Sequence, residues 1–101
     1  MTITTDRQTV EINNAVKDFL VDTLKKRQSN EPIFFCNDDK WCAYDSFVGT
    51  ENEAREMIEA TGWQNEIDQE TGKKIYASTD ELLKVFLNDC EIIEAVDGVK
   101  I

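Results

Sequence analysis

Carboxylates are the side chains with the greatest capacity for chemistry in this chain. Glu53, Glu56 and Glu59 repeat at three-residue spacing, which places them about 5–6 Å apart along one face of a helix. Further carboxylates flank this row in stretches with turn-like composition; they are Asp38, Asp39, Asp45, Glu66, Asp68 and Glu70. Clustered carboxylates can transfer protons, bind a metal ion or form a negative surface for a partner.

Acid–base catalysis is disfavoured by the surroundings of these carboxylates. A general acid or base needs burial to bring its pKa toward neutrality, whereas the candidate groups lie in polar stretches. These candidates are Asp38 with Asp39, and the group of Glu66, Asp68 and Glu70. The chain also has no histidine, the usual partner of a nucleophilic serine or cysteine. We therefore expect a protein that is not an enzyme.

The available ligands do not indicate a metal or cofactor site. Cys36 and Cys42 can approach each other on neighbouring strands, but without histidine or a CxxC motif a zinc site lacks ligands. The acidic stretch that begins at Asp68 departs from the calcium-loop pattern. Gly72 stands at its fifth position instead of the sixth, and Thr79 stands where the closing glutamate belongs. We expect no cofactor, and thiols that are buried in the core.

The acidity is concentrated in the middle of the chain. Residues 31–70 contain eleven acidic and two basic residues, a balance of −9 in a chain whose net charge is −10. Residues 1–30 carry about +1 (four acidic, five basic) and residues 71–101 carry −2 (six acidic, four basic). Nucleic acids and anionic membranes are bound through cations, so neither is an expected partner. A protein with a basic surface is expected instead.

Length and cysteine usage predict a single cytoplasmic domain over residues 1–101. The three cysteines are an odd number without paired spacing, which is typical of a reducing compartment. Residues 1–6 lack the charged and apolar regions of a signal peptide. No apolar run approaches the ~18 residues of a membrane span.

Apolar spacing predicts an α+β domain. The expected elements in chain order are a helix over 6–28, strands over 33–36 and 41–48, a helix over 51–61, strands over 63–67 and 73–77, a helix over 79–88 and a strand over 91–96. Capping boxes mark the three helix starts; they pair Thr5 with Gln8, Thr50 with Glu53, and Ser78 with Glu81. The order α-ββ-α-ββ-α-β predicts a mostly antiparallel sheet packed by helices.

Each expected helix has one face that should be buried. The inward stripe of the first helix consists of Ile12, Ala15, Val16, Phe19, Leu20 and Leu24. In the second helix the inward residues are Ala54, Met57, Ile58 and Thr61, which leaves Glu53, Glu56 and Glu59 on the outward side. Near the C-terminus, Asp97 and Gly98 have the chemistry of a tight turn.

The acidic surface favours a small inhibitor of a nucleic-acid-acting protein. A row of carboxylates can occupy a groove built for phosphates, and opposite charge steers the encounter. Such size, charge and fold class are typical of anti-CRISPR and anti-restriction proteins of phages and plasmids, and of immunity proteins of nuclease toxins. The aromatic side chains of Trp41 and Tyr44 would anchor the contact, although core packing is the default role for these residues and for Trp63 and Phe47. A solvated face that only serves solubility is the simpler alternative.

A second class is a small acidic chaperone or adaptor. Such a protein binds another protein through an apolar groove, often as a homodimer. The sequence leaves open whether this chain is a monomer or a homodimer.

Overall fold

Strands from both ends of the chain meet in one sheet. The structure is a computed structural model that describes residues 2–28, 30–37 and 46–101. Its strands are β1 (Thr2–Thr5), β2 (Thr9–Glu11), β3 (Phe34–Cys36), β4 (Phe47–Gly49), β5 (Glu91–Val96) and β6 (Val99–Lys100). They are arranged in the order β2-β1-β5-β3-β4, with β6 pairing beside this path on β5, and every pair is antiparallel. The predicted α+β class with an antiparallel sheet is confirmed.

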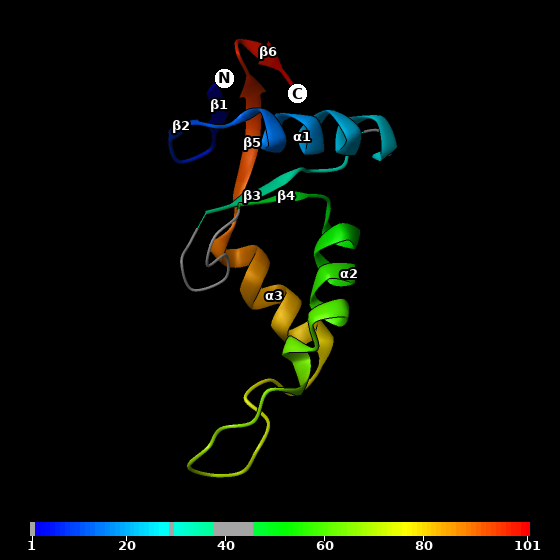
Figure 1. Ribbon diagram of the computed structural model, residues 1–101, viewed down its shortest axis with the longest axis vertical. Coiled ribbons are helices and arrows are strands. Elements are labelled where there is room, and N and C mark those ends of the chain that lie inside the picture. The colour runs from blue at the N-terminus through cyan, green and yellow to red at the C-terminus, as the bar shows by residue number, and fades with distance from the viewer. Residues whose placement is uncertain (1, 29, 38–45) are drawn as a thin grey trace.

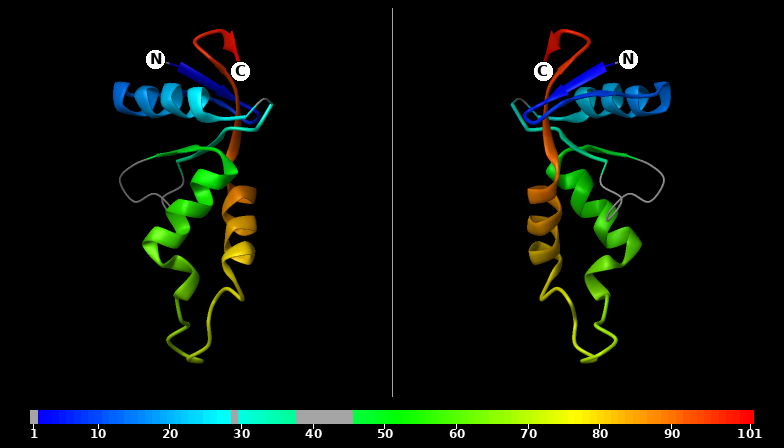
Figure 2. Two further views of the ribbon diagram at one scale, coloured as in Figure 1. Left: turned by 90° about the vertical axis from the view of Figure 1, so that its right-hand side faces the viewer. Right: turned by 90° about the vertical axis from the view of Figure 1, so that its left-hand side faces the viewer.

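The helices occupy two separate places around this sheet. They are α1 (Asn14–Lys26), α2 (Glu51–Thr61) and α3 (Thr79–Asp89), and a 3₁₀ turn, η1 (Trp63–Asn65), follows α2. Figure 1 shows α1 lying across the strands, whereas α2 and α3 extend away from the sheet side by side. The views in Figure 2 show the connection between α2 and α3 as a tip at the far end. The molecule is therefore elongated, with extents of 48 × 26 × 22 Å.

Two clusters of buried side chains hold these parts together. The upper cluster joins α1 to the sheet and contains Ile3, Ile12, Leu20, Ile33, Phe35, Ile93 and Val96. The lower cluster joins α2 and α3 to the lower strands and contains Cys36, Ala54, Ile58, Leu82, Leu83, Phe86 and Cys90. Since β3 contributes Phe35 to the upper cluster and Cys36 to the lower one, this strand connects the two cores. Cys36 and Cys90 are buried as expected, and Cys42 lies outside the described residues.

The prediction of a helix from Asp6 was wrong for the first eight residues. Residues 2–11 form the β1–β2 hairpin, and α1 begins at Asn14 with the side chain of Asn13 as its cap. The Thr5 side chain does accept the backbone N–H groups of Arg7 and Gln8, but it does so in the hairpin turn. Pairing of β1 with the distant strand β5 decides the conformation here, and a local pattern does not reveal such pairing.

The second expected hairpin, over 63–67 and 73–77, is also corrected. Trp63–Asn65 is the 3₁₀ turn η1, and the remaining pairing is one isolated bridge between Ile67 and Lys74. Hydrogen bonds from Asp68 N to Lys73 O and from Ile75 N to Glu66 O extend it slightly. This tip projects away from the sheet (Figure 1), where no further strand is paired with it among the described residues. A two-stranded ribbon without such support is marginal at best.

The second half of the chain otherwise follows the predicted boundaries. Thr50 and Glu53 form the expected capping box at the start of α2, and Gly62 ends the helix in the left-handed conformation at φ 74°. β5 covers the predicted range Glu91–Val96. Asp97 and Gly98 both have positive φ, which builds the tight turn into β6. The strand expected over 41–48 begins outside the described residues, and its end is β4.

Candidate protein-binding surface

Five of the residues predicted to bind a partner lie outside the described part of the structure. They are Asp38, Asp39, Trp41, Tyr44 and Asp45. The remaining predicted residues occupy α2 and the tip between α2 and α3; they are Glu53, Glu56, Glu59, Glu66, Asp68 and Glu70. The structure therefore describes two of the three acidic groups that the sequence places in this surface.

The carboxylate of Glu53 has a structural role. Glu53 is half-buried, and its Oε1 accepts the backbone N–H of Thr50 at 3.2 Å while Thr50 Oγ1 accepts the N–H of Glu53 at 3.3 Å. Its other oxygen lies 3.5 Å from the hydroxyl of Thr23 on α1. Glu53 therefore ties the start of α2 to α1, whereas Glu56 and Glu59 are exposed as predicted.

Thr50→Ala should lower the free energy of unfolding by about 0.5–2 kcal/mol, because it removes the cap of α2. Asn52→Ala changes an exposed residue in the same turn and should have an effect within about 0.5 kcal/mol. Urea denaturation followed by circular dichroism measures both variants. Equal stabilities would show that the capping box contributes nothing.

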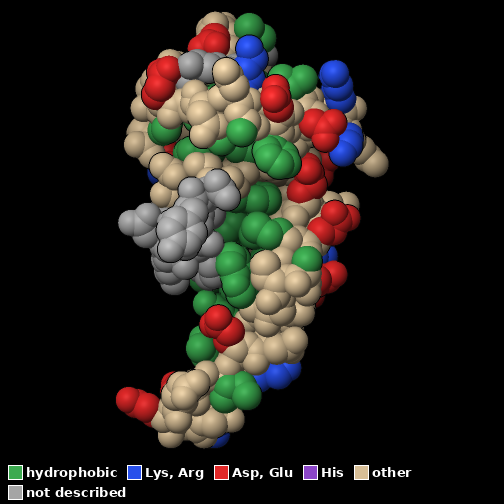
Figure 3. Space-filling view, viewed as in Figure 1, with side chains coloured by type: hydrophobic (Ala, Val, Ile, Leu, Met, Phe, Trp, Pro, Cys, Tyr) green, Lys and Arg blue, Asp and Glu red, His purple; other side chains and the backbone are tan. Residues whose placement is uncertain are grey.

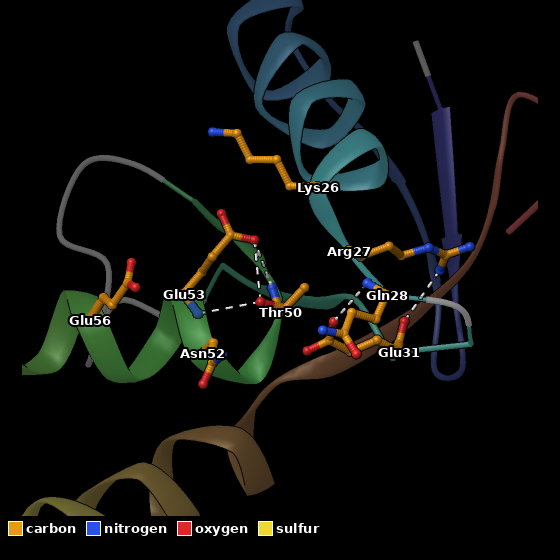
Figure 4. Close-up of a pocket in the computed structure, with 8 residues that line it drawn as sticks. All are labelled: Lys26, Arg27, Gln28, Glu31, Thr50, Asn52, Glu53 and Glu56. Atoms are coloured by element: carbon orange, nitrogen blue, oxygen red, sulfur yellow. Dashed lines mark hydrogen bonds between the residues drawn. The ribbon is translucent and has the colours of Figure 1, made fainter.

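Basic side chains partly offset the row of glutamates. Lys26 at the end of α1 forms an ion pair with Asp22 at 2.9 Å, and Figure 4 shows it on the side of the cavity where Glu53 and Glu56 lie. The hydrogen bond and attraction to Asp22, with smaller contributions from the two glutamates, raise the pKa of Lys26 above its ordinary value. The cavity has a volume of about 580 Å³ and is lined by side chains of both charges, with Arg27 and Glu31 among them. It is less negative than the sequence of α2 alone predicts.

Arg55 plays the corresponding role further along α2. Its guanidinium forms an ion pair with Asp80 on α3, and this hydrogen bond, followed by attraction to Asp80, Glu59 and Glu51, raises the pKa of Arg55. Both side chains remain accessible to solvent, 38% for Arg55 and 77% for Asp80, so the pair adds little to stability. Arg55 therefore places a positive charge near Glu59 on the same helix.

The tip carries the third acidic group. Glu66, Asp68 and Glu70 are all exposed, and Asp68 Oδ1 accepts the backbone N–H of Glu70 at 2.8 Å. Figure 3 shows acidic side chains along the α2 edge of the molecule and again at the tip, with basic side chains between them. On this face the described carboxylates form separate groups spread along the long axis.

An apolar groove beside α2 is the feature that the sequence did not predict. It has a volume of about 410 Å³ and is lined by Val16, Phe19, Ser46, Phe47, Val48, Glu53, Glu56 and Met57. Figure 3 shows hydrophobic side chains gathered on this face between α1 and α2. The groove arises because α1 packs against β4, which leads directly into α2.

Phe19 is the main correction to the predicted core. It was expected in the inward stripe of the first helix, but its side chain is 68% exposed, whereas the neighbouring Leu20 is buried. Successive helical residues point about 100° apart, and on α1 the sheet covers the side that carries Leu20 but not the side that carries Phe19. The breadth of the apolar stripe, which also includes the exposed Ala15, is the signal that could have revealed this.

The other expected aromatic residues divide between core and groove. Trp63 and Phe47 are half-buried and pack against the lower cluster. Phe47 meets the ring of Phe86 edge to face, with 5.3 Å between ring centroids, and it also lines the groove. Phe47 is therefore available to a partner, whereas Trp63 chiefly serves the core.

Among the described residues, no group of three His, Cys, Asp or Glu side chains is placed to hold a metal ion. The buried carboxylate of Glu91 accepts hydrogen bonds from Thr5 and Gln8, which gives it a structural role. Within the described ranges, no helix has the length and apolarity to cross a bilayer.

Comparison with known proteins assigns no family, because no protein-family model, curated protein or solved structure matches this chain.

Proposed function

We propose that this protein is a small acidic, non-enzymatic inhibitor that acts in the cytoplasm on a nucleic-acid-acting protein. It binds the basic surface of that protein and occupies the place of nucleic acid, in the manner of anti-CRISPR, anti-restriction or nuclease-immunity proteins. Its partner is a protein, and it binds neither nucleic acid nor membrane directly.

The exposed carboxylates along the long axis carry this proposal. Glu56 and Glu59 on α2 and Glu66 and Glu70 on the tip project from a molecule 48 Å long. DNA presents phosphates along a comparable length, and proteins that bind it neutralise them with Lys and Arg. A net charge of −10 favours rapid encounter with such a site at low ionic strength.

Charge reversal tests the proposal. The double variant Glu59→Lys/Glu70→Lys changes one carboxylate on α2 and one on the tip, both exposed. The matched control, Glu81→Lys/Glu94→Lys, makes the same change in net charge at exposed positions on α3 and β5. Partners are captured from host lysate and identified by mass spectrometry, and the affinity for the captured protein is then measured at low and high salt.

The expected partner is a nucleic-acid-binding protein from which the wild-type protein displaces DNA or RNA. The Glu59/Glu70 double variant should bind it at least about tenfold more weakly, a loss of about 1.4 kcal/mol. Binding by the wild-type protein should weaken steeply with salt. The proposal fails if the affinity does not change with salt and both double variants bind as tightly as the wild-type protein. It also fails if the partner can bind nucleic acid and this protein at the same time.

A chaperone or adaptor is the second candidate, and the apolar groove between α1, β4 and α2 favours it. A protein of that class uses the groove to hold an apolar segment of its client. Its partner would remain bound at high salt, and the charge-reversal variant would capture it as well as the wild-type protein does.

A further inference from the structure

The aromatic side chain of Phe19 is largely exposed to solvent on α1. Its ring stands on the outer side of α1 and is 68% exposed. One side of it borders the apolar groove, and the other borders a shallow hollow lined by Ala15, Asp18 and Asp22. Exposing an aromatic ring costs hydrophobic stabilisation, and aromatic side chains are enriched at the centres of protein interfaces.

The groove beside Phe19 has an apolar floor. Val16, Phe47, Val48 and Met57 line it, and each of these side chains is only partly buried. Phe47 is held in place by its contact with Phe86 in the lower core. A volume of about 410 Å³ lies in the range of small-ligand and anchor pockets. The floor is therefore preformed and suits one or two large apolar side chains.

The rim of the groove is acidic. Glu53 and Glu56 line the groove itself, and Asp18 and Asp22 line the hollow on the other side of Phe19. Lys26, which is paired with Asp22, is the cation close to Glu53 and Glu56. Four carboxylates and one ammonium leave this rim with a balance of about −3, which complements Lys and Arg side chains.

We propose that the groove binds a basic segment of the partner protein, in which an apolar side chain enters beside Phe19 and flanking Lys or Arg side chains meet the acidic rim. The inference rests on the proposed function in one respect, namely that the partner is a basic protein. A second copy of this chain fits poorly, because two acidic rims would face each other. Nucleic acid fits poorly for the same reason.

A labelled peptide tests the groove directly. The probe has about twelve residues, with a central leucine–phenylalanine pair between lysines; one control peptide carries glutamates in place of the lysines, and another carries serines in place of the apolar pair. Fluorescence anisotropy measures binding to the full chain. Both control peptides should bind at least about tenfold more weakly than the probe.

Protein variants locate the binding. Phe19→Ser should weaken binding of the probe at least about tenfold, whereas Val99→Ser, which alters an equally exposed residue (67%) on β6, should leave it unchanged. Glu56→Gln should weaken binding and reduce its salt dependence, and Glu94→Gln should do neither. Because Phe19 and Val99 are both exposed, neither substitution should impair folding.

Three results of the peptide experiment would overturn the inference. They are absence of probe binding, equal binding by the glutamate peptide, and unchanged binding to the Phe19→Ser variant. A dimer in light scattering that Phe19→Ser dissociates would likewise overturn it, since a second copy would then occupy the groove. If Phe19→Ser has no effect while Glu59→Lys/Glu70→Lys abolishes partner capture, the groove inference fails and the proposed function stands. If the probe binds as expected but the captured partner does not act on nucleic acid, the groove inference stands and the proposed function fails.

Discussion

Phe86→Ala should lower the free energy of unfolding by about 3–5 kcal/mol. Phe86 is fully buried in the lower cluster, where its ring meets that of Phe47 edge to face. Truncation leaves a cavity between α3, α2 and the sheet that the surrounding side chains can only partly fill. A domain of this size has a total stability of about 5–15 kcal/mol, so the loss is a large share of it. Urea denaturation followed by circular dichroism measures the effect.

The matched control for this prediction lies one residue away. Val85 is on the exposed side of α3, and Val85→Ala should change stability by less than about 0.5 kcal/mol. Should Phe86→Ala prevent folding, Phe86→Leu keeps most of the volume and should cost about 1–1.5 kcal/mol. A loss of less than about 1 kcal/mol for the alanine variant would contradict the packing of α2 and α3 described above.

The loss of the phenyl ring of Phe86 should also change the shape of the apolar groove. Because Phe47 contacts Phe86 in the core and lines the apolar groove, Phe86→Ala removes the support for the groove floor. Stability and groove geometry are therefore coupled through this one pair of rings.

Glu91→Ala should lower the free energy of unfolding by about 1.5–3 kcal/mol. Glu91 is only 8% exposed, and its carboxylate oxygens lie 2.6 Å from the hydroxyl of Thr5 and 2.8 Å from Nε2 of Gln8. These contacts join the turn of the β1–β2 hairpin to the start of β5. The alanine variant leaves two donors without this acceptor and removes the link between residues that are more than eighty positions apart.

Two further variants separate the hydrogen bonds from the general effect of substitution. Glu91→Gln keeps an acceptor oxygen and should cost less than Glu91→Ala. Glu94→Ala alters an exposed residue on the same strand and should change stability by less than about 0.5 kcal/mol. Chemical denaturation of all three variants provides the comparison. Equal losses for Glu91→Ala and Glu94→Ala would contradict a structural role for the buried carboxylate.

Local chemistry made α2, α3 and the turn between β5 and β6 predictable. The capping box of Thr50 with Glu53 and the left-handed Gly62 mark both ends of α2, and Ser78 caps α3. The tight turn at Asp97 and Gly98 likewise requires only local backbone preferences. Where neighbouring residues supply the stabilising interaction, the sequence pattern is sufficient.

The N-terminal hairpin was not predicted, and the first helix was expected to begin too early, because the interactions that stabilise this segment are distant in sequence. Ile3 is buried beside Val96 through the pairing of β1 with β5, and the hydroxyl of Thr5 meets Glu91. Neither partner is visible in a window of helical spacing. Ile12 was consequently assigned to the inward stripe of the following helix, and the strands β1 and β2 were not predicted.

The sequence by itself determined the composition of the surface: a charge of −9 within forty residues, an absence of histidine, and a helix with glutamates at three-residue spacing. Tertiary structure alone decided which of those groups remain available to a partner. It brought Glu53 to the hydroxyl of Thr23 on α1, placed Lys26 beside the row, paired Arg55 with Asp80 on α3, and turned Phe19 outward above an apolar groove. The physical reason is that charge and periodicity are properties of single residues and their neighbours, whereas burial, pairing and cavity shape depend on how distant elements pack.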